Sequence, residues 1–146
     1  MAANMACLNF GIKSPRIGVA GLNPHAGENG TMGEEEQIFI KPAIKEAINS
    51  GLDVRGPISP DIIYSMAREK KFDIVVSLYH DQGLIPFKYL GVGNGVNVTI
   101  GLPFVRTSPD HGTAFDIAGK GIANPNSFFK AVSCAEKMIN WEIYQF

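Results

Sequence analysis

FDIVVSL at residues 72–78, followed at once by YHDQG at residues 79–83, is the stretch of sequence from which the fold can be inferred. The first seven residues are mostly apolar and β-branched, which is typical of a strand buried on both faces of a parallel sheet. Ligands of open α/β sheets bind beyond the carboxyl ends of the strands. His80 and Asp81 therefore stand where a site is expected, and a plain polar loop is the alternative.

The composition is that of an ordinary globular protein with one domain. The chain has 146 residues, of which 45% are hydrophobic and 18% charged, and this is enough for a core. A formal net charge of −1 gives no electrostatic reason to bind nucleic acid or an anionic membrane. No apolar run is long enough to span a bilayer, and no signal peptide is recognisable. Cys7 and Cys134 are expected to be free thiols of a cytoplasmic protein.

Strands and helices are expected to alternate along the chain. The pattern predicts strands at residues 16–22, 54–58, 72–78 and 96–105, and helices at residues 34–51, 59–71 and 125–144. Residues 1–15 and 84–95 are expected to be irregular, and the first helix is expected to be interrupted near Pro42. This alternation favours an α/β fold, with a mainly parallel sheet flanked by helices and a single unit over residues 1–146.

All three histidines of the chain follow predicted strands in glycine-containing loops: His25, His80 and His111. Parallel strands bring such loops to one edge of a sheet, so His25 and His80 could share a divalent metal. Two imidazoles do not complete a metal site. The third ligand would have to come from Asp61, Asp81, Asp110, a partner subunit or residues outside this chain.

Charged residues near these loops are further candidates. Asp61 and Asp81 are candidate acid/base groups or carboxylates that orient a metal-bound imidazole, although Asp61 fits helix capping as well. Lys88 and Arg106 lie in apolar, glycine-rich surroundings, which suits a phosphate or carboxylate anchor; solvated loop charges are the alternative. No Gly-x-Gly-x-x-Gly lies between a strand and a helix, so a Rossmann cofactor site is not supported.

Four motifs together resemble one enzyme family over residues 11–140. They are NPHAGE at residues 23–28, YHDQG at residues 79–83, GVNVTIGLP at residues 95–103 and RTSPDHGTA at residues 106–114. Their order and spacing are similar to those of the 4-hydroxythreonine-4-phosphate dehydrogenase family of pyridoxal-phosphate biosynthesis. The stretch from His111 to Pro125 also looks like the adenosine-binding loop of isocitrate and isopropylmalate dehydrogenases.

The resemblance implies an isocitrate/isopropylmalate dehydrogenase-like fold and a role for each matching residue. It implies His25 and His80 as metal ligands and Asp61 and Asp81 as active-site carboxylates. The other roles implied are substrate binding by Lys88, Asn97 and Arg106, and cofactor binding by His111, Gly112, Thr113, Ala114 and Asn124. The implied cofactors are NAD or NADP and a divalent metal (Zn, Mg or Co). The implied partners are a small phosphorylated substrate and a second subunit that shares the metal site in a homodimer.

The chain departs from the family pattern in two respects. Family members are considerably longer, so the chain is expected to be the C-terminal portion of such an enzyme. SPDI at residues 59–62 stands where the family usually has PADT, which keeps the aspartate and loses a hydroxyl. Three hypotheses follow: this dehydrogenase, a related dehydrogenase of phosphorylated threonate or erythronate, or a non-catalytic fragment that dimerises.

Overall fold

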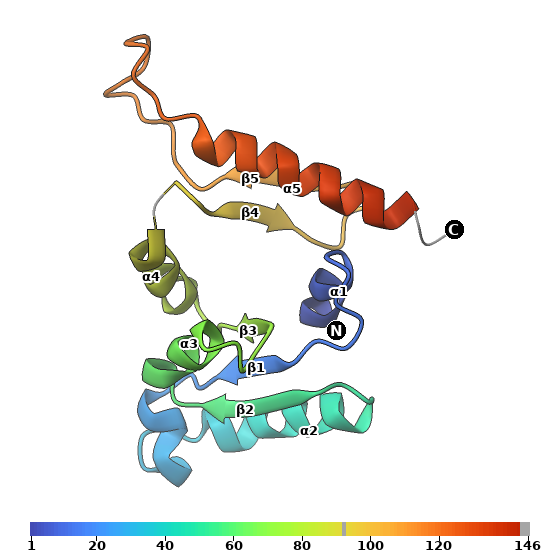
Figure 1. The fold of residues 1–146 in the computed structure, drawn as a ribbon. Coiled ribbons are helices and arrows are strands. Elements are labelled where there is room, and N and C mark those ends of the chain that lie inside the picture. The colour runs from blue at the N-terminus through green and yellow to red at the C-terminus, as the bar shows by residue number, and fades with distance from the viewer. Residues whose placement is uncertain (92, 144–146) are drawn as a thin grey trace. The chain divides into compact units, whose positions relative to one another are not determined.

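The computed structural model describes residues 1–91 and 93–143 and divides the chain into two compact units, residues 1–86 and 87–146 (Figure 1). Each unit has its own sheet, so each is described separately below. The sequence predicts a single α/β unit over residues 1–146. The single unit stays a prediction.

The first unit is built on a parallel sheet with the strand order β2-β1-β3 (Figure 1). The strands are β1 (Ile17–Ala20), β2 (Val54–Ile58) and β3 (Ile74–Val76), and β1 pairs in parallel with both neighbours. The helices are α1 (Ala2–Leu8), α2 (Lys41–Asn49) and α3 (Pro60–Arg68), with the tighter turn η1 (Pro24–Gly30) and the wider turn η2 (Glu36–Ile40). An α/β fold with a parallel sheet flanked by helices is therefore confirmed.

Side chains of alternate residues on β1 enter two hydrophobic cores. Ile17 packs with Ile44 of α2 and Val54 of β2. Ala20 points to the other face, where it packs with Ile63 of α3 and Phe72. This alternation is the two-residue period of a strand covered on both faces.

Gly18 in β1 is required for one of these contacts. A Cβ atom built on Gly18 would lie 2.9 Å from the ring of Phe72, closer than real Cβ atoms approach. The missing side chain lets Phe72 close the core against β1.

The second unit contains an antiparallel hairpin covered by one long helix. The strands are β4 (Val96–Thr99) and β5 (Arg106–Pro109), and the helix is α5 (Asn126–Ile143). The hydroxyl of Thr107 donates to the carbonyl of Ala131, 2.8 Å away, and ties β5 to α5. The helix predicted at residues 125–144 is thus confirmed from Asn126 to Ile143; Pro125 precedes it, and Tyr144 lies outside the described residues.

Three expectations about secondary structure are wrong. Residues 1–15 include the helix α1, because Ala, Met and Leu are strong helix formers. The strand predicted over residues 96–105 ends at Thr99 as β4, because Gly101 adopts a positive φ of 84° and turns the chain, which then returns as β5 from Arg106.

Residues 84–95 belong largely to a helix, α4 (His80–Gly91), although Gly83 and Pro86 are poor helix formers. Gln82 anchors its first turn by accepting a hydrogen bond from the amide of Leu78 at 2.7 Å. Tertiary contacts of this kind override the local preference for a loop. In the described part of the chain, no helix combines the length and apolar character needed to cross a membrane.

An ion pair joins the starts of β1 and β3. The guanidinium of Arg16 donates to Asp73 at 2.8 and 3.0 Å, and the Arg16 amide donates at 2.8 Å. These hydrogen bonds lower the pKa of Asp73 to about 2. Because this pKa lies below the unfolded value of 3.8, the stabilisation is present above pH 3.8 and is lost as the pH falls toward 2.

Asp73→Asn is therefore expected to lower the melting temperature modestly at neutral pH. The difference from the unsubstituted chain should shrink below pH 3.8 and disappear only below the folded-state pKa of about 2, where Asp73 is protonated in both states. Thermal unfolding followed by circular dichroism across this range is the measurement. Glu46→Gln, at an exposed position of α2, is the control, and a pH-independent difference for Asp73→Asn would contradict the ion-pair explanation.

Candidate active site

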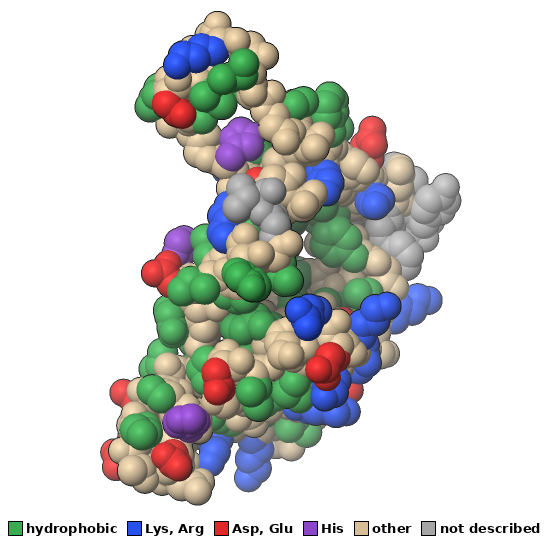
Figure 2. All heavy atoms as spheres, turned by 60° about the vertical axis from the view of Figure 1, so that its left-hand side comes forward, with side chains coloured by type: hydrophobic (Ala, Val, Ile, Leu, Met, Phe, Trp, Pro, Cys, Tyr) green, Lys and Arg blue, Asp and Glu red, His purple; other side chains and the backbone are tan. Residues whose placement is uncertain are grey.

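His25 and His80 follow two neighbouring parallel strands of the first unit. Val19 of β1 lies opposite Val76 of β3, so both chains leave the sheet at its carboxyl edge. The expected position of the two histidines on that side of the sheet is confirmed. Both side chains are exposed, and Figure 2 shows histidine side chains at the molecular surface.

His25 lies in a left-handed turn at the end of β1. Five successive residues of η1 have positive φ angles: His25 (53°), Ala26 (53°), Gly27 (78°), Glu28 (41°) and Asn29 (57°). This conformation is unfavourable for residues with a Cβ atom, and strained backbone persists only where its surroundings determine it. The sequence suggests only a flexible, glycine-rich loop here, so the left-handed turn is a structural finding.

The buried carboxylate of Glu36 holds the chain just before this turn. Its Oε1 accepts hydrogen bonds from the amides of Leu22 and Asn23, both at 2.8 Å. Its Oε2 accepts a hydrogen bond from the Asn23 side-chain amide, also at 2.8 Å. Burial by itself raises the pKa of Glu36, but the hydrogen bonds from Asn23 and Leu22 outweigh it and lower the pKa. Glu36 is therefore a buried anion solvated by N–H groups.

His25 and Asp61 line one cavity of about 260 Å³ in the first unit, together with five other residues: Leu22, Pro24, Ser59, Pro60 and Tyr79. The Ser59 hydroxyl donates to Oδ1 of Asp61 at 2.5 Å. This bond lowers the pKa of Asp61, and the nearby His25 acts in the same direction. Ser59 precedes α3 without capping it through its side chain; its hydroxyl holds the Asp61 carboxylate instead.

His80 and Asp81 begin α4 rather than lying in a loop. Oδ1 of Asp81 lies 2.7 Å from Nδ1 of His80. This contact leaves Nε2 as the ring nitrogen available to a ligand, and a carboxylate in that position is the usual partner of a metal-bound imidazole. The adjacent Gln82 donates from Nε2 to the carbonyl of Gly21 at 2.7 Å. It therefore ties the start of α4 to the exit of β1.

The donor types in the first unit suit a divalent metal, but the set is incomplete. Imidazole and carboxylate are common ligands for such ions, and His25, His80 and Asp61 supply both types. Within residues 1–91 and 93–143, however, no group of three or more His, Cys, Asp or Glu side chains is close enough to hold an ion. A complete metal site would need at least one further ligand. The two cysteines are free, as expected, and Cys7 is buried.

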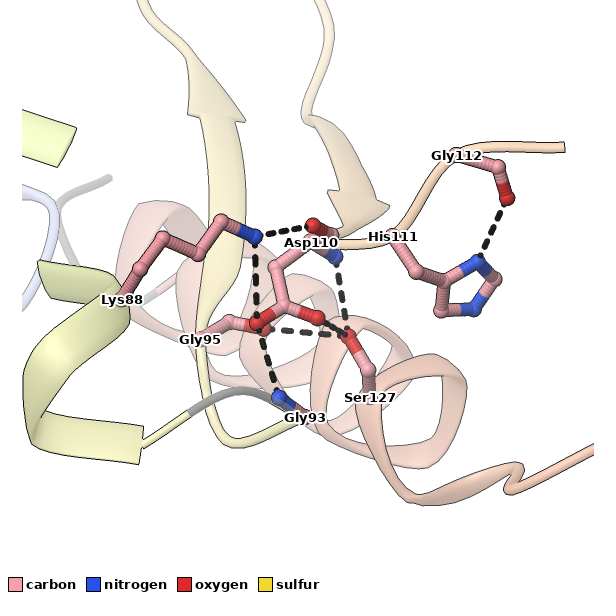
Figure 3. Close-up of polar contacts among 7 residues, drawn as sticks. All are labelled: Lys88, Gly93, Gly95, Asp110, His111, Gly112 and Ser127. Atoms are coloured by element: carbon pink, nitrogen blue, oxygen red, sulfur yellow. Dashed lines mark hydrogen bonds and ion pairs between the residues drawn. The ribbon is translucent and has the colours of Figure 1, made fainter. Parts of the chain in front are cut away.

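In the second unit, Asp110 is the centre of a hydrogen-bond cluster that includes Lys88 (Figure 3). The Asp110 carboxylate is 3% exposed and accepts hydrogen bonds from the Ser127 hydroxyl at 2.8 Å and the Gly93 amide at 3.0 Å. Nζ of Lys88 donates to the Asp110 carbonyl at 2.5 Å and lies 3.8 Å from Oδ2. Lys88 is thus on a helix and held in place, not a charge in a flexible loop.

Both carboxylate oxygens of Asp110 already accept a hydrogen bond, Oδ1 from the Ser127 hydroxyl and Oδ2 from the Gly93 amide. Burial raises its pKa less than the Ser127 hydrogen bond lowers it, so the pKa of Asp110 is below its usual value. Its role among the described residues is to order Lys88 and the end of β5, which makes it a poor candidate for the third metal ligand.

Asn97 and Arg106 lie on the same face of the β4–β5 hairpin. Arg106 pairs with Thr99, and Asn97 pairs with Ser108, so these four side chains share one face by strand alternation. Thr107 points the other way, toward α5. Nη1 of Arg106 donates to Oγ1 of Thr99 at 2.6 Å. Two of the predicted substrate-binding residues are therefore brought together on the face that α5 does not cover.

The predicted cofactor-binding residues His111, Gly112, Thr113 and Ala114 form an exposed segment without regular structure. The His111 ring points away from the Asp110 cluster and contacts the Gly112 carbonyl at 3.0 Å (Figure 3). Oδ1 of Asn124 accepts a hydrogen bond from the Asn126 amide at 3.0 Å, at the start of α5. Cofactor binding by these residues stays a prediction.

Two site residues are not identified from the sequence: Glu36 and Gln82. Glu36 is one of three successive glutamates, a pattern that favours a helix start. Gln82 follows a histidine and an aspartate that draw attention first. Two weak sequence features mark these residues. Glu36 comes just before the apolar residues at positions 38–40, and Gln82 belongs to the polar stretch that follows the strand at residues 72–78. Neither signal identifies the backbone groups that these side chains bind.

Asp110→Ala is expected to lower the free energy of unfolding by about 1–3 kcal/mol. The substitution leaves the Gly93 amide without this acceptor and leaves the buried Ser127 hydroxyl only its longer hydrogen bond to the Gly95 carbonyl, at 3.2 Å. Urea denaturation is the measurement. Glu136→Ala, at an exposed position of α5, is the matched control and should be close to neutral. Equal stabilities of the two variants would show that the Asp110 cluster does not stabilise this unit.

Comparison with known proteins identifies a family. Residues 1–135 match the family model described as "Pyridoxal phosphate biosynthetic protein PdxA". A 4-hydroxythreonine-4-phosphate dehydrogenase from Bradyrhizobium diazoefficiens is 56% identical over 129 residues, which are 88% of this chain and 37% of that protein. A protein from Oceanobacillus iheyensis, provisionally named D-threonate 4-phosphate dehydrogenase, is 56% identical over 125 residues, or 85% of this chain and 38% of that protein.

A solved structure agrees with these matches. The crystal structure of 4-hydroxythreonine-4-phosphate dehydrogenase from Klebsiella pneumoniae has a TM-score of 0.83 and 46% sequence identity to this chain. The likeness covers 94% of this chain and 42% of that one. The chain thus spans about two fifths of the length of the relatives that it matches.

Proposed function

The chain belongs to the family of the pyridoxal phosphate biosynthetic protein PdxA, and from this premise we propose that it is part of an NAD-dependent dehydrogenase of 4-hydroxythreonine 4-phosphate. The observation that carries the proposal is the position of His25 and His80 at one edge of the parallel sheet, with Asp61 in the His25 cavity. We infer an isocitrate/isopropylmalate dehydrogenase-like fold for the intact protein and a cytoplasmic reaction without nucleic-acid or membrane partners.

His25 and His80 would hold a divalent cation (Zn, Mg or Co), which when bound supplies Lewis-acid stabilisation of negative charge on oxygen. Asp81 orients the His80 ring from 2.7 Å, which fixes the tautomer that leaves Nε2 free. The chain's own part in the metal site is therefore two imidazoles held by the exits of β1 and β3.

Bound NAD would supply the hydride acceptor for oxidation of the substrate's secondary alcohol. The hydroxyl proton passes to a carboxylate, for which Asp81 and Asp61 are the candidates. The resulting β-keto acid loses carbon dioxide. The hydrogen bond from Ser59 lowers the pKa of Asp61, which keeps this carboxylate ionised but makes it a weaker proton acceptor.

The second unit supplies residues for anion binding. Lys88, Asn97 and Arg106 would hold the anionic substrate through charge-assisted and neutral hydrogen bonds. The Asp110 carbonyl fixes the Lys88 ammonium group, and Thr99 fixes the Arg106 guanidinium. Prior fixation of this kind lowers the cost of orienting a substrate. His111, Gly112, Thr113, Ala114 and Asn124 are proposed to border the NAD or NADP.

A chimera tests this function. Residues 1–135 of this chain would replace the matching segment of the Bradyrhizobium relative, and NADH formation would be measured with added Zn²⁺, Mg²⁺ or Co²⁺. The proposal expects turnover of 4-hydroxythreonine 4-phosphate. Turnover of D-threonate 4-phosphate alone would favour the second candidate, for which the 56% identity to the Oceanobacillus protein is the supporting observation. Turnover of neither substrate would contradict both.

We also propose a homodimer in which both subunits contribute to the metal site, since the described residues hold no complete ligand set. Large apolar side chains remain exposed on η2 and α5, including Phe39 (66%) and Phe129 (62%), and such exposure is typical of surfaces that associate. Light scattering at micromolar concentration is expected to give the mass of two chains. A monodisperse monomer would contradict the proposal.

A further inference from the structure

Glu36 has the environment of a residue that fixes backbone geometry rather than one that fills a core. Its side chain is fully buried, and none of the ion pairs in the described part of the chain includes it. Its side-chain hydrogen-bond donors are neutral N–H groups of Leu22 and Asn23. A buried carboxylate is costly without such donors, so the donors and the carboxylate hold each other in one arrangement.

The same carboxylate touches the left-handed turn itself. A Cβ atom built on Gly27 would lie 2.6 Å from Oε2 of Glu36, so Gly27, with φ of 78°, packs directly against the carboxylate. Glu36 therefore contacts the chain on both sides of His25, two residues before it at Asn23 and two residues after it. Backbone hydrogen bonds from Ala26 to Asn23 and from Met32 to Gly27 complete the turn.

The direction of the His25 side chain depends on this arrangement. The φ angle of 53° at His25 sets where its Cβ points, and its imidazole lines the cavity that contains Asp61. Relaxation of the turn to negative φ angles would turn the imidazole away from that cavity. The strained conformation needs an external contact to persist, and Glu36 is the buried side chain that supplies one.

We propose that Glu36 is a positioning residue for His25: its carboxylate fixes the exit of β1 and the left-handed turn so that the imidazole is held ready to bind a divalent metal. This inference rests on the proposed function, because it takes His25 as a metal ligand. Glu36 itself would not touch the metal or the substrate.

Glu36→Gln is the principal variant, because it preserves side-chain size while replacing one oxygen by an NH₂ group that meets the amide donor of Asn23. Glu34→Gln removes the same charge at an exposed position two residues earlier and is the matched control. Asn23→Ala is the second variant. It removes the side-chain donor to Glu36, together with the hydrogen bond from the same amide to Glu35 at 2.7 Å, and leaves both backbone hydrogen bonds to Glu36. It therefore remains informative if Glu36→Gln does not fold.

The first readout requires no metal and is amide hydrogen exchange of this chain. In Glu36→Gln, exchange at Leu22 and Asn23 should accelerate by about 10-fold or more, since these amides lose their charged acceptor. The amide of Gly21, which donates to Ile58 within the sheet, should be unchanged. Loss of exchange protection at Leu22 and Asn23, with protection of Gly21 unchanged, would distinguish a positioning role from general destabilisation.

The second readout is Zn²⁺ titration followed by the imidazole NMR signals of the three histidines, assigned by single His→Gln variants. The His25 signal should respond at about 10-fold or more higher Zn²⁺ in Glu36→Gln than in the unsubstituted chain, the size typical for partners of metal ligands. Asn23→Ala should also raise the Zn²⁺ concentration at which the His25 signal responds, and Glu34→Gln should leave it unchanged.

The outcomes separate this inference from the proposed function. Unchanged exchange and unchanged Zn²⁺ response in both Glu36→Gln and Asn23→Ala would overturn the positioning role. If the His25 signal of the unsubstituted chain does not respond to Zn²⁺, the metal part of the proposed function fails. Faster exchange at Leu22 and Asn23 with an unchanged Zn²⁺ response would show that Glu36 holds the turn without controlling His25, which also overturns the inference.

Discussion

Residues 1–146 alone are expected to form NADH from 4-hydroxythreonine 4-phosphate at least about 100-fold more slowly than the chimera described above. Hydride transfer requires the reacting atoms to be held in near-attack geometry, and displacement by an ångström already costs about 100-fold. His25, His80 and Asp61 are all exposed, and the described residues form no complete metal site. The chain also spans only 37% of the Bradyrhizobium relative.

The measurement is NADH absorbance with added divalent metal, at equal concentrations of the isolated chain and the chimera. Addition of the separately produced N-terminal part of the relative should restore turnover, and the same part denatured beforehand should not. Comparable turnover by the isolated chain would show that residues 1–146 contain a complete site. The interpretation of the chain as part of a larger catalytic unit would then be wrong.

The parallel sheet could be predicted because the local sequence of two of its strands is typical of buried strands. Residues 16–22 and 72–78 are short, apolar and β-branched, and they form β1 and β3. Their polar ends place His25 and His80 correctly because every parallel strand delivers its carboxyl end to the same edge. The helix α3 has an apolar stripe that a 3.6-residue period reveals, with Ile63 fully buried.

The helix α4 and the left-handed turn could not be predicted, because contacts distant in sequence determine both. Gly83 and Pro86 favour a loop, whereas Gln82 bonds to the carbonyl of Gly21, 61 residues earlier, and anchors a helix there. The turn at His25 depends on Glu36, whose partners precede it by 13 and 14 residues. Sequence patterns reveal local periodicity, but they do not identify the backbone groups that a buried side chain will bind.

His80→Ala in the chimera is expected to reduce both Zn²⁺ affinity and kcat/KM by more than about 100-fold. Replacement of a residue that only orients a metal ligand typically costs 10–100-fold, and loss of the ligand itself should exceed this range. Asp81, which contacts Nδ1 of His80, provides the comparison within the same site. Asp81→Asn should lower the Zn²⁺ affinity by about 10–100-fold, which is a smaller loss of affinity than that expected for His80→Ala.

The fold should survive His80→Ala, because His80 is exposed at the first residue of α4 and alanine favours helices. Equal thermal midpoints would establish this, and Cys134→Ala should leave affinity, kcat/KM and midpoint unchanged. An imidazole that served only the helix terminus would give the opposite pattern, with a lowered midpoint and unchanged Zn²⁺ affinity. Such a result would remove His80 from the metal site. The hydride-transfer proposal would then need a different ligand at this edge of the sheet.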